Sequence, residues 1–180
     1  MAAPKMMEYG QTFWWIGQLM NWQAFANDPK NRYPTETETL AQNLLSFIYN
    51  GKGIMNFSTA YLVQKGDEMI AGQREGDWRR SNLACAELAP FIRSDIKPPQ
   101  CTVKTSQGTL LHRLFTDGKG NYRLLLVAPF SGTTRATIEI PDGFVFERSQ
   151  CYTVTKESNG ALAFYGRDVA CDIIQIRQAK

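Results

Sequence analysis

The stretch TLLHRLFTDGKGNYRLLLVA, residues 109–128, decides the fold of the second half of the chain. It contains two runs of β-favouring residues, 109–116 and 122–128. Between them stand Asp117 and Gly118, a pair that favours a tight turn between antiparallel strands. This stretch therefore predicts an antiparallel hairpin.

The same pattern continues to the C-terminus, where Asp142-Gly143 and Asn159-Gly160 are further turn signals. The expected strands are 101–105, 109–116, 122–128, 133–140, 144–154, 161–165 and 170–177. Short strands at such spacing are typical of a β-sandwich or barrel. Prolines at 98 and 99 stiffen the chain just before them. We therefore predict an antiparallel β-sandwich domain over residues 98–180.

The first half has a different pattern. Residues 13–19 form an apolar run typical of a strand that is buried on both faces. Thr35 and Glu38 make a capping box that begins a helix, which is expected to end at Asn50-Gly51. A second short strand is expected at 53–57. After it come a polar loop with glycines at 66, 72 and 76, and a helix from Trp78 to about Arg93 that Pro90 bends or shortens. The fold class is thus α+β by segments, with a βαβα segment at 1–97.

Composition excludes several classes of protein. The 180 residues carry a net charge of +3, which is too small to indicate a nucleic-acid partner. No apolar run reaches the roughly 20 residues that cross a bilayer, and the N-terminus lacks the apolar region of a signal peptide. We expect a soluble chain without a membrane partner. The sequence leaves its localisation open.

Cysteine and histidine patterns indicate no metal site. The four cysteines form no CxxC motif, and His112 is the single histidine. A disulfide between Cys151 and Cys171 requires that their strands be neighbours, and the sequence leaves this open. Because no Walker A or dinucleotide GxGxxG motif is present, we expect no cofactor and no metal. His112 is interpreted as a strand residue without a catalytic role.

Three segments together are similar to a known family. They are WWIGQ at 14–18, RYPT at 32–35 followed by Glu38, and NGKGI at 50–54 followed by Phe57. This series resembles the last two βα units of (β/α)8 glycoside hydrolases, whose final barrel strand follows a Gly-x-Gly turn. The second half resembles the small β-sandwich that follows such barrels. A whole barrel needs eight strands and about 250 residues, so the chain resembles a C-terminal portion of such an enzyme.

The resemblance implies sugar contact rather than catalysis by this chain. Glycosidases use two carboxylates, and the end of the strand at 13–19 carries no Asp or Glu. Glu36 and Glu38 are assigned to the helix N-terminus. We therefore assign no catalytic residue. The expected carbohydrate-contact residues, at the carboxyl ends of the two strands, are Gln18, Asn21, Trp22, Asn56, Ser58 and Tyr61.

Three alternatives stay open. Trp14, Trp15 and Trp22 can also be core or interface aromatics. The sandwich itself can be a carbohydrate-binding or protein-interaction module, or the chain can be a structural remnant without activity. The binding-module alternative predicts exposed aromatics on the sandwich. The candidates are Tyr122, Phe144, Phe146, Tyr152, Phe164 and Tyr165.

The apolar strands also predict a partner. Strands such as 13–19 and 53–57 suit the middle of a parallel sheet, where other strands cover both edges. Uncovered edges favour association. We therefore expect either self-association or a companion chain that completes the sheet.

Overall fold

The fold is described from a computed structural model. The structure describes residues 12–18, 32–57, 68–158 and 160–179. The chain divides into two compact units, Met1–Glu87 and Leu88–Lys180. The prolines at 98 and 99 predict a boundary slightly further along the chain. The short helix before them belongs to the second unit.

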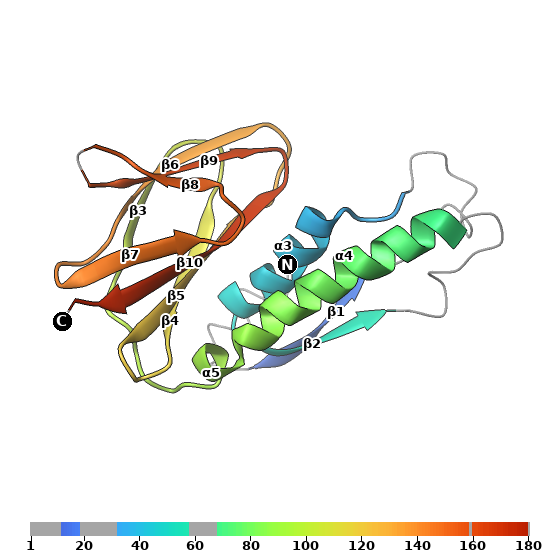
Figure 1. Ribbon diagram of the computed structural model, residues 1–180, viewed down its shortest axis with the longest axis horizontal. Helices are drawn as coiled ribbons and strands as arrows, with labels where there is room; N and C mark the ends of the chain where they lie inside the picture. The colour runs from blue at the N-terminus through green and yellow to red at the C-terminus, as the bar shows by residue number, and fades with distance from the viewer. Residues whose placement is uncertain (1–11, 19–31, 58–67, 159, 180) are drawn as a thin grey trace. The chain divides into compact units, whose positions relative to one another are not determined.

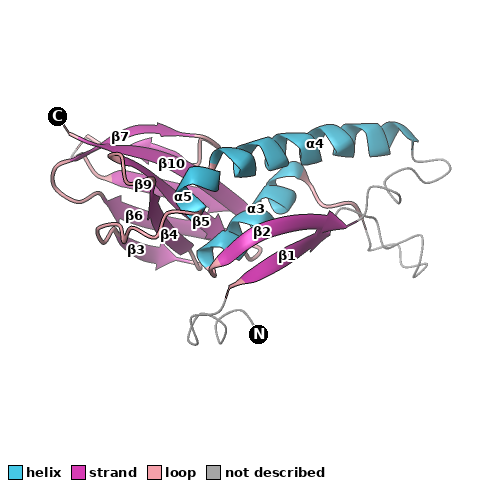
Figure 2. Ribbon diagram, turned by 90° about the horizontal axis from the view of Figure 1, so that it is seen from below, coloured by secondary structure: helices cyan, strands magenta, loops and turns pink. Residues whose placement is uncertain are grey.

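The first unit has the predicted order of strand, helix, strand and helix (Figure 1). Its elements are β1 Phe13–Gln18, α3 Glu36–Ile48, β2 Gly51–Phe57 and α4 Glu68–Glu87. β1 and β2 are parallel neighbours, as a strand–helix–strand crossover requires. Both helices lie on one side of the strand pair (Figure 2).

Helix α3 begins and ends where local chemistry predicts. The Thr35 hydroxyl accepts a hydrogen bond from the Glu38 amide at 3.2 Å, and the Glu38 carboxylate accepts one from the Thr35 amide at 2.8 Å. The predicted capping box is therefore confirmed. At the other end Asn50 has a φ of 72°, a left-handed conformation that asparagine tolerates.

Helix α4 corrects one expectation. The sequence predicts a loop around Gly72 and Gly76, but this stretch is helical from Glu68 onward. Glycine lowers helix propensity without forbidding a helix, and α4 packs along α3, to which Arg80 is linked through Glu36. The expected effect of Pro90 is confirmed, since α4 ends at Glu87 and Pro90 lies in the first turn of a separate helix.

The second unit is an antiparallel sandwich of two four-stranded sheets, preceded by helix α5, Ala89–Ile92 (Figure 1). One sheet has the order β4-β5-β10-β7 and the other β3-β6-β9-β8. The strands are β3 Thr102–Gln107, β4 Leu111–Thr116, β5 Asn121–Ala128, β6 Thr133–Glu139, β7 Phe144–Ser149, β8 Val154–Lys156, β9 Leu162–Arg167 and β10 Ala170–Gln178. The mixed α+β fold with a sandwich-like arrangement of sheets is thus confirmed.

One expected strand divides into two. The run 144–154 forms β7 in one sheet and β8 in the other. The residues between them bind a buried carboxylate of β10, which is described below. The core between the sheets is apolar, and its fully buried members include Leu124, Leu126, Ile138 and Ile174.

Strands β5 and β10 are buried on both faces. Leu124 and Leu126 face the core, whereas Leu125 and Val127, on the opposite face, are also fully buried. Helix α5 lies beside β4, and the Arg123 guanidinium carbon is 4.5 Å from the centroid of its Phe91 ring. The continuous run of leucines that marked β5 in the sequence therefore reflects burial on both sides.

Candidate functional site

The carboxyl ends of β1 and β2 meet at one edge of the parallel pair. Gly17 is the register partner of Asn56, and Gln18 that of Phe57. Gln18 and Asn56, two of the sequence-predicted contact residues, therefore lie at the same end of the strand pair. The other four, Asn21, Trp22, Ser58 and Tyr61, lie outside the described residues.

Asn56 is directed at the helices. Its amide nitrogen donates to Asn82 Oδ1 of α4 at 2.7 Å. Beside it the fully buried Asn43 of α3 donates from its amide nitrogen to Ser81 Oγ at 3.2 Å. Sequence reasoning missed Asn43, Ser81 and Asn82. The one sequence feature that could have indicated this cluster is Asn43 itself, a polar residue among the apolar residues of the amphipathic helix α3.

This amide cluster explains a glycine. A Cβ atom on Gly17 would lie 2.6 Å from Asn56 Oδ1 and 3.3 Å from Asn43 Oδ1. Both oxygens are buried and, within the described part of the chain, accept no hydrogen bond. A side chain at position 17 would therefore require the Asn56 amide, and to a smaller extent the Asn43 amide, to move.

The thiol beside this cluster is not a nucleophile. Burial raises the pKa of Cys85 to about 12, against a smaller opposing effect of its hydrogen bond with Asn43. With this pKa the Cys85 thiol stays protonated at neutral pH. It is therefore unreactive, because the thiolate is the nucleophilic form.

All four cysteines are free, so the disulfide between Cys151 and Cys171 that the sequence left open is not formed.

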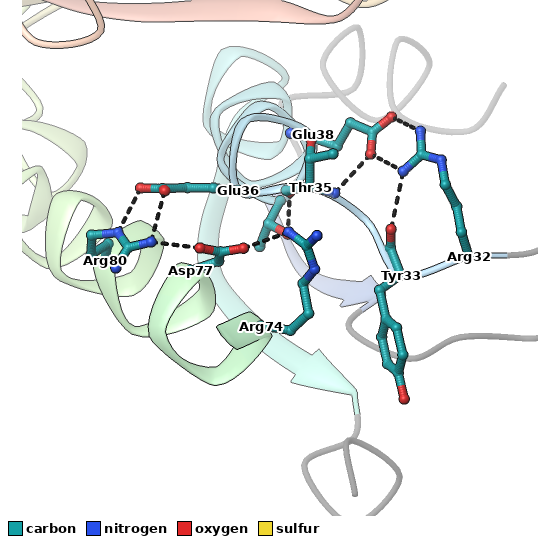
Figure 3. Close-up of polar contacts among 9 residues, drawn as sticks. Arg32, Tyr33, Thr35, Glu36, Glu38, Arg74, Asp77 and Arg80 are labelled. Atoms are coloured by element: carbon teal, nitrogen blue, oxygen red, sulfur yellow. Dashed lines mark hydrogen bonds and ion pairs between the residues drawn. The ribbon is translucent and has the colours of Figure 1, made fainter. Parts of the chain in front are cut away.

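An arginine–carboxylate network surrounds the start of α3 (Figure 3). Arg32 donates to both oxygens of Glu38, at 2.6 and 2.7 Å. This hydrogen-bonded ion pair is the main reason why the pKa of Glu38 falls to about 2. A carboxyl group with so low a pKa is ionised at neutral pH and cannot act as a general acid.

The same network engages the other carboxylates there. Arg80 donates to both oxygens of Glu36 at 3.0 Å and to Asp77 at 2.5 Å, and Arg74 donates to Asp77 at 2.6 Å. Figure 3 shows Arg80 between Glu36 and Asp77. Glu36 and Glu38 lie in the first turn of α3, where their negative charge complements the helix dipole. Asp77 pairs with two arginines of its own helix, α4.

On the sandwich, two of the six candidate aromatics are well exposed. Tyr152 is 88% exposed and Tyr165 is 53% exposed. Phe164 is buried in the core, whereas Tyr122, Phe144 and Phe146 pack against that core. The binding-module alternative is thus reduced to two tyrosines on the β8–β9 side of the sandwich.

A buried carboxylate fixes the segment before β8. Asp172 is fully buried. Its Oδ1 accepts from the amides of Gln150, Cys151 and Ile173, at 2.9, 3.0 and 2.8 Å. Its Oδ2 accepts from Ser149 Oγ at 2.5 Å, and from the amide and hydroxyl of Thr153 at 3.0 and 2.8 Å. Asp172 therefore holds residues 149–153 at several points.

His112 lies in β4, and burial lowers its pKa below the ordinary value. It is therefore neutral at physiological pH.

Within the residues that the structure describes, no group of three or more His, Cys, Asp or Glu could hold a metal ion. None of the described helices is long and apolar enough to cross a membrane.

Comparison of the chain with protein-family models, with curated proteins and with solved structures gives no match. The case for a function therefore depends on the residues and the geometry described above.

Proposed function

We propose that this chain is the C-terminal part of a glycoside-hydrolase-like protein. In this proposal β1–α3–β2–α4 supplies the last two βα units of a (β/α)8 barrel, and the sandwich supports the barrel. The parallel register of β1 and β2, the crossover through α3 and the sandwich that follows all support this order of elements.

One observation carries the proposal. The face of the strand pair that points away from the helices is apolar and exposed: Trp14 is 68%, Ile16 59% and Met55 56% exposed. On the opposite face Gly17 is buried beside Asn43 of α3. In a (β/α)8 barrel the helices form the outer ring and the opposite strand face points to the packed interior. An exposed apolar face of this kind suits further barrel strands.

The barrel proposal places carbohydrate at the carboxyl ends of the strands. The residues that would contact it there are Gln18, Asn21, Trp22, Ser58 and Tyr61. Asn56 would hold this end of β2 in place through its hydrogen bond to Asn82 of α4. The chain alone should not hydrolyse glycosides, because the carboxyl end of its first strand carries no Asp or Glu and glycosidases need two placed carboxylates. Nitrophenyl glycosides should therefore show turnover only when the remaining βα units are supplied. Turnover by the chain alone that disappears on changing one of its Asp or Glu residues would overturn this proposal.

The exposed face gives a direct test. Multi-angle light scattering at tens of micromolar should show self-association of the chain, since uncovered strand edges and apolar side chains associate. Ile16→Glu should shift the chain to monomer. Leu83→Glu is the matched control, because Leu83 is 61% exposed on α4, away from the strand pair. A monomeric parent chain with tryptophans protected from iodide quenching would mean a self-contained α+β domain, and the barrel proposal would have to be abandoned.

A further inference from the structure

Tyr152 is held in an unfavourable backbone conformation. Its φ is 61°, a left-handed value that is uncommon for a bulky residue other than glycine. The amides on either side, of Cys151 and Thr153, both donate to the buried Asp172 carboxylate. Such conformations persist where the surroundings impose them, and they cluster at ligand-binding sites. Here the imposed conformation presents a side chain that is almost fully exposed.

The antiparallel pairing that β8 forms with β9 places the second tyrosine, Tyr165, across from the residue after Tyr152. The Tyr165 amide donates to the Thr153 carbonyl at 2.9 Å, so Tyr165 is opposite the residue that follows Tyr152. Along β9, Leu162 and Phe164 face the core. Because strand residues alternate between faces, Tyr165 and Arg167 lie on the outer face.

Two arginines accompany Tyr165 on this outer face. Arg135 of β6 is the register partner of Tyr165, and its guanidinium carbon lies 5.3 Å from the centroid of the Tyr165 ring. Arg167, two residues along β9, is exposed. Neither arginine forms an ion pair with a carboxylate of the described residues. Stacking on a ring orients a guanidinium for bidentate binding of an anion.

We propose that Tyr152, Tyr165, Arg135 and Arg167 form a binding site for an acidic saccharide. The tyrosines would contact the apolar face of a pyranose ring, and the arginines would bind its carboxylate or sulfate group. Charge complementarity favours an anionic sugar over a neutral one. This site lies on the sandwich and stands independently of the barrel proposal, whose contact residues are in the first unit.

Isothermal titration of the full chain at low salt tests the site with three probes. These are a tetragalacturonate, a heparin-derived hexasaccharide and the neutral cellotetraose. Binding of either acidic probe, with cellotetraose at least about tenfold weaker, supports the proposal. Preference between the two acidic probes tells carboxylate from sulfate recognition. Binding of neither, or equal binding of cellotetraose, overturns the proposal.

Matched variants assign the binding to these residues. Tyr165→Ala should weaken it about tenfold, whereas Tyr165→Phe, which keeps the ring, should leave it unchanged. Arg135→Gln should weaken it, whereas Arg177→Gln, on β10 of the other sheet, should not. Equal losses in both members of a pair, or no loss in either, would contradict the assignment.

Tyr152→Gly separates binding from folding. Glycine adopts a positive φ without strain, so the midpoint of urea unfolding should stay the same or rise. Binding of the acidic probe should nevertheless fall, because the exposed ring is lost. Unchanged binding in this variant would exclude Tyr152 from the site, and a large fall in the unfolding midpoint would contradict the strain on which the argument depends.

Discussion

Replacing Asp172 by asparagine should destabilise the sandwich strongly. The carboxylate accepts six hydrogen bonds from Ser149, Gln150, Cys151, Thr153 and Ile173. In Asp172→Asn the amide oxygen can keep the three backbone donors around Oδ1. The amide nitrogen then takes the place of Oδ2 and faces the Thr153 amide, now 3.0 Å from another donor. The two hydroxyls can rotate to accept, but that backbone N–H cannot.

The size of the effect follows from these contacts. One backbone N–H left without an acceptor costs about 1–3 kcal/mol, and hydrogen bonds to a charged group are worth about 1.5–3 kcal/mol against about 1 kcal/mol for neutral ones. Removing a buried charge recovers part of this loss. We therefore expect a loss of about 3 kcal/mol in the free energy of unfolding. For a unit of this size, that corresponds to a fall in Tm of about 12–24 °C.

The assay is urea unfolding followed by circular dichroism, together with calorimetry, on the full chain. Asp142→Asn is the matched control, since Asp142 is an exposed turn residue and its substitution should change the free energy of unfolding by less than about 0.5 kcal/mol. A change in Asp172→Asn no larger than that of the control would refute the reasoning. An equally large loss in both variants would point to net charge rather than to the buried hydrogen bonds.

Two further predictions concern the α5 segment and the start of α3. Fragments 88–180 and 98–180 should both unfold cooperatively with β-type circular dichroism. The longer should be more stable, because α5 lies beside β4 and its Phe91 ring lies 4.5 Å from the Arg123 guanidinium carbon; absence of a cooperative melt in 98–180 would place the boundary elsewhere. Glu38 has a pKa of about 2 in the folded chain, below its ordinary 4.5, so its stabilising contribution is present above pH 4.5 and is lost as the pH falls towards 2. Glu38→Gln should lower stability by about 1 kcal/mol at pH 7 and should flatten this pH dependence; an unchanged pH profile in urea titrations would contradict the ion pair.

Features with a local chemical cause were predictable from the sequence. The capping box at Thr35 and Glu38 is confirmed, and Gly118 and Gly143 adopt positive φ values in the predicted turns. These depend on residues only a few positions apart. Residues 144–154 divided between two sheets because Asp172, far along the chain, holds residues 149–153. No periodicity in the sequence shows such a contact.

The candidate site was predictable in part for the same reason. That Gln18 and Asn56 lie at one end of the strand pair follows from two parallel strands, and the register shows it. The orientation of Asn56 towards Asn82 depends on how α4 packs, which apolar spacing does not determine. Likewise, the six candidate aromatics of the sandwich all lie in or beside β-favouring runs, so the sequence alone did not tell exposed ones from buried ones. Only the arrangement of the sheets distinguishes the exposed Tyr152 from the buried Phe164.

The burial of β5 and β10 on both faces has a consequence for the unfolded chain. A segment such as 170–176 is apolar and β-favouring, and segments of this kind stack into cross-β aggregates when they are exposed. Asp172 places a charge inside that segment, and Arg123 of β5 and Arg177 of β10 lie near one end of the paired strands. In the unfolded chain these charges act as gatekeepers against aggregation. The carboxylate that fixes the loop in the native state thus also opposes aggregation of this segment before β5 and β10 pair.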